Sequence, residues 1–200
     1  MLDWLLFFLV TFGCAMIPGA NMAIVLRNSL GGSRRDGLLT VAGLATALLI
    51  HGSLSLLGIT ALLQQSPALF DGIRWCGAGY LLLLGLWQLF RRRAPEAEAP
   101  TAQPRARSPY LSGLLISLLN PKVMFFFLAV FAQLLHAQQS LAEQLLYITT
   151  PAMAEMSWFA LLLTLLARPA IRTRLLQVKG LLEQLIGGAL VALGVKLGLG

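Results

Sequence analysis

Three ionisable side chains, His51, Lys122 and Glu155, interrupt long apolar stretches of this 200-residue chain. A carboxylate can bind a cation or take up a proton, an ammonium group can bind an anion, and imidazole titrates near neutral pH. Because Lys122 and Glu155 carry opposite charges, they could form an ion pair or bind the two ends of a zwitterion. Glu155 and His51 are the candidates for proton coupling, although His51 could equally be a neutral packing residue.

Two proline motifs lie in equally apolar surroundings. Proline in a helix interior removes a backbone hydrogen bond, and in lipid such a break is tolerated where it lines a cavity or is buried in protein. A helix starting at Asn120-Pro121 would direct free N–H groups at an anionic guest such as an amino-acid carboxylate. Ordinary proline kinks and interhelical hydrogen bonds are the alternative. We predict a substrate-binding site made of Pro18, Gly19, Asn21, Asn120, Pro121 and Lys122.

The composition predicts an all-α integral membrane protein that positions these residues on transmembrane helices. Of all residues, 58% are hydrophobic and 12% are charged, whereas about 25% are charged in ordinary soluble domains. A span needs ~20 predominantly apolar residues. Six segments qualify, at Trp4–Leu26, Leu39–Leu63, Leu69–Phe90, Tyr110–Leu135, Glu143–Ala167 and Gly180–Leu199. His51, Lys122 and Glu155 each fall about 18 Å into a span, near the bilayer midplane, where charges are rare and functional.

The basic residues predict the orientation. Twelve of the fifteen Lys and Arg residues lie in or beside the first, third and fifth connectors, and the second and fourth connectors have none. The positive-inside rule places the three basic connectors in the cytoplasm and both termini outside. The N-terminus lacks a basic n-region, so we predict a first span there instead of a cleaved signal peptide.

The chain is predicted to be a single membrane domain, 1–200, made of two halves. Residues 1–90 form the first three-helix repeat, 91–109 a proline-rich flexible cytoplasmic linker, and 110–200 the second three-helix repeat. Because each half has three helices, the second enters the membrane from the opposite side, and homologous halves would form an inverted repeat. The first helix of each half is broken by proline, which is typical of a transporter's binding site.

Several other classes are disfavoured. The net charge of +7 is concentrated in connectors, so nucleic acid is not an expected partner. No nucleotide loop, zinc motif or catalytic triad is present, and we predict no enzyme activity, cofactor or metal site. Cys14 and Cys76 lie in apolar stretches and are expected to be buried free thiols. The small-residue face of Gly188 and Ala192 suits contacts within one chain and between chains equally well, so a homo-oligomer stays open.

Four blocks of sequence resemble the lysine exporter (LysE/RhtB) family of bacterial inner-membrane permeases. They are Pro18-Gly19-Ala20-Asn21, Arg34-Arg35-Asp36-Gly37 with Gly43 and His51, Gly77-Ala78-Gly79-Tyr80-Leu81 with Gly85, and Leu118-Leu119-Asn120-Pro121-Lys122. The resemblance covers nearly the whole chain except the linker. It departs from the family pattern at Ala20, where a second proline is typical.

The resemblance implies a secondary transporter that exports amino acids or close derivatives, driven by the proton gradient or the membrane potential. The partners would be a small-molecule substrate and the lipid bilayer of the inner membrane. Two alternatives stay open. One is a membrane thiol–disulfide electron carrier using Cys14 and Cys76. The other is export of another small solute or a metal ion.

Overall fold

The computed structural model describes residues 2–17, 19–90, 108–134, 139–166, 184–185, 187–192 and 194–195, and the regular structure in these ranges is helical. The helices are α1 (Leu2–Met16), α2 (Ala20–Leu30), α3 (Arg34–Gln65), α4 (Pro67–Phe90), α5 (Pro109–Leu118), α6 (Pro121–Leu134) and α7 (Leu141–Leu166). Pro18, residues 91–107 of the predicted linker and half of the predicted sixth span lie outside the described residues.

The helices agree with the first five predicted spans. Three of them, α3, α4 and α7, are long and apolar enough to cross a membrane. Two bent pairs, α1 with α2 and α5 with α6, would each count as one broken span, which gives up to five spans in the described residues. The bends are 54° and 57°, and they fall at the two predicted proline motifs. The sixth span and the inverted repeat stay predictions.

Short polar signals start the helices that follow each break or connector. Ser33 caps α3, where its hydroxyl accepts the Asp36 N–H at 3.2 Å and donates to the Asp36 carboxylate at 3.0 Å. At the start of α7 the Ser140 hydroxyl likewise accepts the Glu143 N–H at 3.3 Å and donates to the Glu143 carboxylate at 2.9 Å, and the Ser140 N–H donates to the same carboxylate at 2.8 Å. Such reciprocal capping satisfies the free N–H groups of a first turn. The long helices α3 and α7 therefore begin in the same way.

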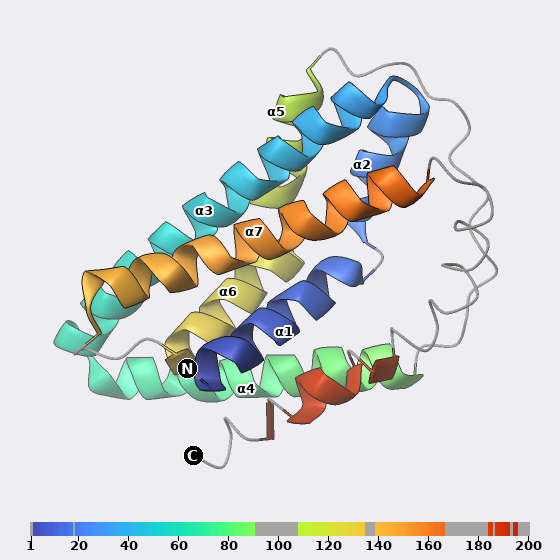
Figure 1. The fold of residues 1–200 in the computed structure, drawn as a ribbon. Helices are drawn as coiled ribbons and strands as arrows, with labels where there is room; N and C mark the ends of the chain where they lie inside the picture. The colour runs from blue at the N-terminus through green and yellow to red at the C-terminus, as the bar shows by residue number, and fades with distance from the viewer. Residues whose placement is uncertain are drawn as a thin grey trace.

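The two longest helices organise the bundle. In Figure 1, α3 and α7 lie side by side across the molecule, and the broken pairs α1–α2 and α5–α6 pack against them. α3 contacts α5 and α7, α1 contacts α7, and α4 contacts α6. The Trp4 indole N–H donates to the Thr150 hydroxyl at 3.0 Å and ties α1 to α7.

Glycines let pairs of helices approach backbone to backbone. A methyl group on Gly43 of α3 would collide with the Tyr110 carbonyl, and one on Gly113 of α5 with the Thr40 carbonyl. At a second crossing, a Cβ on Gly85 of α4 would lie 2.7 Å from the Gly187 carbonyl oxygen. Gly43, Ala47 and His51 follow one another at four-residue spacing on α3 and are all buried, so this face of the helix packs inside the bundle. Close approach through small residues is the usual way membrane helices associate.

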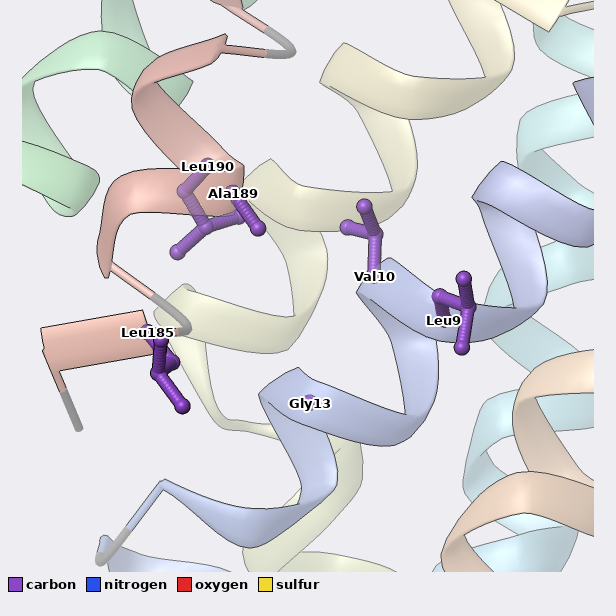
Figure 2. A pocket seen from close by; sticks show the side chains of 6 residues that line it. All are labelled: Leu9, Val10, Gly13, Leu185, Ala189 and Leu190. Carbon is purple, nitrogen blue, oxygen red and sulfur yellow. The ribbon is translucent and has the colours of Figure 1, made fainter. Parts of the chain in front are cut away.

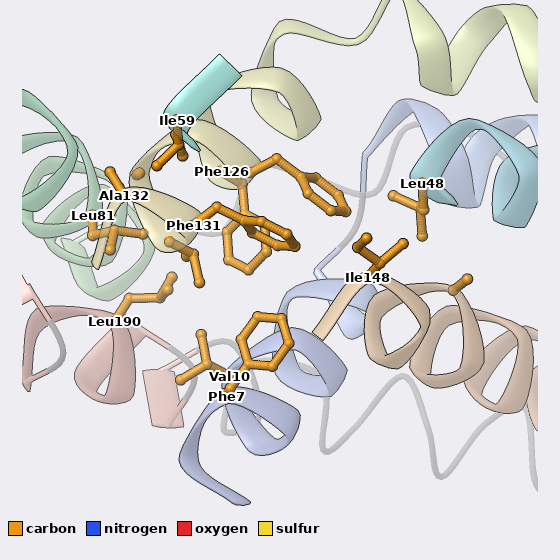
Figure 3. Packing of buried hydrophobic residues seen from close by; sticks show 14 of the residues in the cluster. Phe7, Val10, Leu48, Ile59, Leu81, Phe126, Phe131, Ala132, Ile148 and Leu190 are labelled. Atoms are coloured by element: carbon orange, nitrogen blue, oxygen red, sulfur yellow. The ribbon is translucent and has the colours of Figure 1, made fainter. Parts of the chain in front are cut away.

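The apolar interior has two clusters. The larger one joins α1, α3, α4, α6 and α7, and includes Phe7, Phe126, Phe131, Ile148 and Leu190 (Figure 3). The smaller one joins α2, α3 and α7, and includes Val25, Leu44, Trp158, Phe159 and Leu162. The outer surface is also apolar, with side chains such as Leu57, Leu83, Trp75 and Phe90 more than half exposed. A surface this apolar suits lipid and not water.

Candidate functional site

Asn21 is the centre of a buried polar cluster. Its side-chain amide donates to the Glu155 carboxylate at 2.8 Å and to the Ser117 hydroxyl at 3.4 Å. Its carbonyl oxygen accepts from the Asn120 amide at 3.2 Å. These bonds connect residues 96 to 134 positions apart in the sequence, so the fold alone brings them together.

The two helix breaks position this cluster. Asn21 lies in the first turn of α2, directly after the first break, and Asn120 lies between α5 and α6 at the second. Ser117 is one turn before Asn120 and is fully buried. The two breaks therefore contact each other inside the bundle through these side chains. Backbone interruptions at membrane depth are tolerated only where they are buried in protein or line a cavity.

Glu155 comes to the cluster from α7 and is 6% exposed. On the same helix, Ile148 and Ala152 belong to the larger apolar cluster, and Trp158 and Phe159 to the smaller one. Glu155 therefore lies at the boundary between the two clusters. A carboxylate in such a place requires a donor, and Asn21 supplies it.

His51 reaches the cluster only indirectly. Its Nε2 lies 3.4 Å from the Ser117 carbonyl oxygen, and its ring stacks on Phe127 at a centroid distance of 5.9 Å. A carbonyl can only accept, so Nε2 carries the proton in this contact. His51 and Glu155 are thus linked through Ser117 and Asn21, and the structure brings the two predicted proton-coupling candidates to opposite sides of one network.

Lys122 lies in the first turn of α6, half-buried, and its ammonium group makes no hydrogen bond or ion pair with any described residue. It is close enough to Glu155 and Cys14 to interact with both electrostatically. Tyr80 of α4 holds its backbone, since the Tyr80 hydroxyl donates to the Lys122 carbonyl at 3.3 Å. Lys122 and Glu155 therefore share one neighbourhood without touching.

The two helix starts at the breaks differ. The Asn120 side chain accepts the Lys122 N–H at 3.0 Å, so the expectation of free donors at the start of α6 is only partly correct. No side chain caps α2, whose N-cap is the exposed Gly19. A Cβ on Gly19 would meet nothing closer than the Ile17 carbonyl oxygen at 4.0 Å, so the space beside it is open. The uncapped donors and positive dipole end lie at α2.

Three residues in or near the polar cluster were not predicted. Ser117 could have been found, because it is a polar residue in an apolar stretch only three positions before Asn120. Pro151 interrupts the hydrogen bonding of α7 one turn before Glu155. The indole Nε1 of Trp158 is buried and has no hydrogen-bond partner in the described ranges. A proline or a tryptophan in an apolar helix does not by itself indicate that a functional site is nearby.

The cysteines were predicted to be buried, and this is wrong for Cys76, which is exposed on α4, whereas Cys14 is half-buried. Both thiols are free. Among the described residues, no group of three His, Cys, Asp or Glu side chains is placed to hold a metal ion.

Apolar recesses elsewhere do not include the polar cluster. One of about 160 Å³ lies between α1 and the C-terminal helical residues, lined by Leu9, Val10, Gly13, Leu185, Ala189 and Leu190 (Figure 2). A second of about 280 Å³ lies between α4 and α6 and includes Tyr80 and Phe125. Neither contains a charged side chain, so neither suits a zwitterion.

Comparison with known proteins gives consistent matches over most of the chain. The profile of the LysE type translocator family matches residues 6–200. The uncharacterized membrane protein YahN of Escherichia coli is 28% identical over 95% of this chain and 85% of its own length. The leucine efflux protein of an Enterobacter species is 32% identical over 91% of this chain and 86% of its own length. No solved structure matches the chain.

Proposed function

The chain belongs to the LysE type translocator family of membrane transporters, and on this premise we propose that it exports amino acids or close derivatives from the cytoplasm. The substrate would bind where the two helix breaks meet. The observation that supports this site is the cluster around Asn21, because it joins both breaks to a buried carboxylate.

The charges of the cluster suit a zwitterion. The Lys122 ammonium group has no partner in the described part of the chain, and Glu155 already accepts one hydrogen bond from Asn21. A substrate carboxylate would bind Lys122 and the uncapped start of α2, and the substrate ammonium group would bind Glu155. Both ends of the amino acid then find an opposite charge in a site where unpaired charge is costly.

The transport cycle would be alternating access between the two halves, related as inverted repeats around this site. Substrate arrival would break the bonds of Asn21 to Asn120 and Glu155, and so release the breaks from each other. Export would be driven by the proton gradient or the membrane potential, with Glu155 or His51 taking up the coupling proton. We place the protein in the bacterial inner membrane with both termini outside, following the basic connectors.

Leucine is the first substrate to test, because the Enterobacter relative is by its name a leucine efflux protein. Cells with and without the gene are loaded with leucine-containing and other dipeptides, and each released amino acid is quantified over time, with and without a protonophore. We expect faster release of a small set of amino acids and its loss with the protonophore.

Glu155→Gln keeps the size of the side chain and removes its charge, and we expect at least a tenfold slower export with normal membrane insertion. Glu143→Gln is the matched control, because Glu143 is an exposed cap at the start of α7, and export should continue. Export by Glu155→Gln at the wild-type rate and with the same proton dependence would exclude Glu155 from the site. If the wild type releases no amino acid faster than cells without the gene, the proposed function is wrong.

A further inference from the structure

Trp158 has a feature that the packing of the bundle does not explain. Its side chain is 6% exposed, and its indole Nε1 is a buried donor without a hydrogen-bond partner among the residues that the structure describes. Buried polar groups in native proteins are nearly always hydrogen-bonded, so each exception calls for an explanation such as a missing ligand. The Trp4 indole in the same chain follows the rule, with Thr150 as its acceptor at 3.0 Å.

The position of Trp158 points to the site. It follows Glu155 by three residues on α7, which places both side chains on the same face of the helix, about one turn apart. Its ring meets the edge of Phe12, at a centroid distance of 6.2 Å, in the last turns of α1 before the first break. Met22, next to Asn21 on α2, packs against the same cluster. Trp158 therefore lies between Glu155 and the first break.

Within the described part of the chain, no acceptor is hydrogen-bonded to the indole. The cluster around it consists of Ile24, Val25, Leu44, Phe159, Leu162 and other apolar side chains. An orphaned N–H in such a place costs about 1–3 kcal/mol, which the fold would avoid if phenylalanine served equally well. A ligand bound beside Glu155 could bring the acceptor that the indole lacks.

We propose that Trp158 is a substrate-binding residue whose indole N–H donates to the substrate carboxylate. This rests on the proposed function and adds a third contact to it. In an amino acid, the carboxylate carbon is only two bonds from the ammonium nitrogen. When the substrate ammonium group binds Glu155, the substrate carboxylate is therefore within reach of the Trp158 indole, one helical turn away. Since the indole nitrogen is buried in this conformation, the contact requires a rearrangement that exposes it to the substrate.

The ring of Trp158 also restricts the substrate. With Phe12, Met16 and Met22 it forms an aromatic and thioether surface. A basic side chain would find no partner there, whereas an aliphatic one would be buried favourably. The substrate class that fits is the neutral amino acids with an aliphatic side chain.

Trp158→Phe tests the donor, because it removes the N–H and keeps most of the ring. The protein is reconstituted in liposomes, and the KM is measured with radiolabelled L-leucine and with whichever amino acid the wild type releases. We expect a rise in KM of about tenfold or more, the value of a hydrogen bond to a charged group. Thermal stability should change little, because removal of the unpartnered donor offsets the loss of buried ring area. Trp4→Phe is the control, and we expect lower stability with an unchanged KM.

A second measurement covers the case in which Trp158→Phe does not fold. With Trp4, Trp75 and Trp87 replaced by Phe, Trp158 is the single tryptophan, and its fluorescence should shift on adding the transported amino acid. An unchanged KM in Trp158→Phe, or an unchanged spectrum in the single-tryptophan protein during active transport, would overturn the proposal. A wild type that transports lysine better than leucine would overturn the aliphatic preference alone, and a wild type that transports no amino acid would overturn the site itself.

Discussion

Replacing Asn21 by leucine removes the group that joins both helix breaks to α7. The two side chains are similar in size, but leucine makes no hydrogen bond. The variant loses the 2.8 Å bond to Glu155, the 3.4 Å bond to Ser117 and the 3.2 Å bond from Asn120. Because Glu155 is 6% exposed, water cannot easily replace the lost donor.

The expected loss of stability follows from the kinds of hydrogen bond that the substitution removes. A hydrogen bond to a charged group contributes about 1.5–3 kcal/mol, and a neutral bond between membrane helices about 0.6 kcal/mol. Asn21→Leu should therefore destabilise the protein by about 3–4 kcal/mol, with the larger part due to Glu155. When Glu155 is already glutamine, all three bonds are neutral, and the same change should cost about 2 kcal/mol.

The difference is a coupling of about 1–2 kcal/mol between positions 21 and 155, which a double-mutant cycle measures. The free energy of unfolding is obtained by denaturant titration of the four proteins in mixed micelles. Pairing Asn21→Leu with Glu143→Gln is the control, and it should be additive because Glu143 contacts Ser140 at the start of α7. Additivity within about 0.5 kcal/mol for Asn21 and Glu155 would refute a strong bond between them.

Two further predictions concern packing and the thiols. Gly113→Ala should destabilise the protein by about 1–3 kcal/mol, because the added methyl group collides with the Thr40 backbone carbonyl. Gly58→Ala should stabilise it by about 0.5–1 kcal/mol, because nothing lies within 4 Å of the added Cβ. Thermal unfolding of both variants checks these values. Cys76→Ser should leave amino-acid export unchanged, because Cys76 is exposed on α4 and takes no part in the hydrogen bonds of Asn21. Loss of export in that variant would favour a thiol–disulfide carrier.

The helical architecture was predictable because its causes are local. Proline in an apolar stretch breaks a helix wherever it lies, so the bends at Gly19 and at Asn120 could be expected from their sequence neighbourhoods. Long apolar runs predicted the remaining spans for the same reason. Even the caps follow this rule, since Ser140 and Glu143 form a recognisable pair.

The partners within the site could not be predicted in this way. Asn21 meets Glu155 across 134 residues, and only the packing of α2 against α7 determines which polar residues of two spans come together. The prediction that Cys76 is buried was wrong for a related reason. A helix that is apolar on every side carries no pattern to distinguish the face toward lipid from the face toward the bundle. Trp158 was overlooked because tryptophan usually contributes apolar area, and its N–H matters only where an acceptor is lacking.

The backbone contacts at Gly43, Gly113, Gly85 and Gly187 affect how homologous sequences should be compared. These positions accept no side chain without separating two helices, whatever solute is carried. Evolution will therefore preserve them in exporters of different specificity, and their invariance in an alignment will report assembly and not recognition. Divergence in specificity should be sought where a side chain can change without moving a backbone, at residues such as Met16 and Met22 beside the first break.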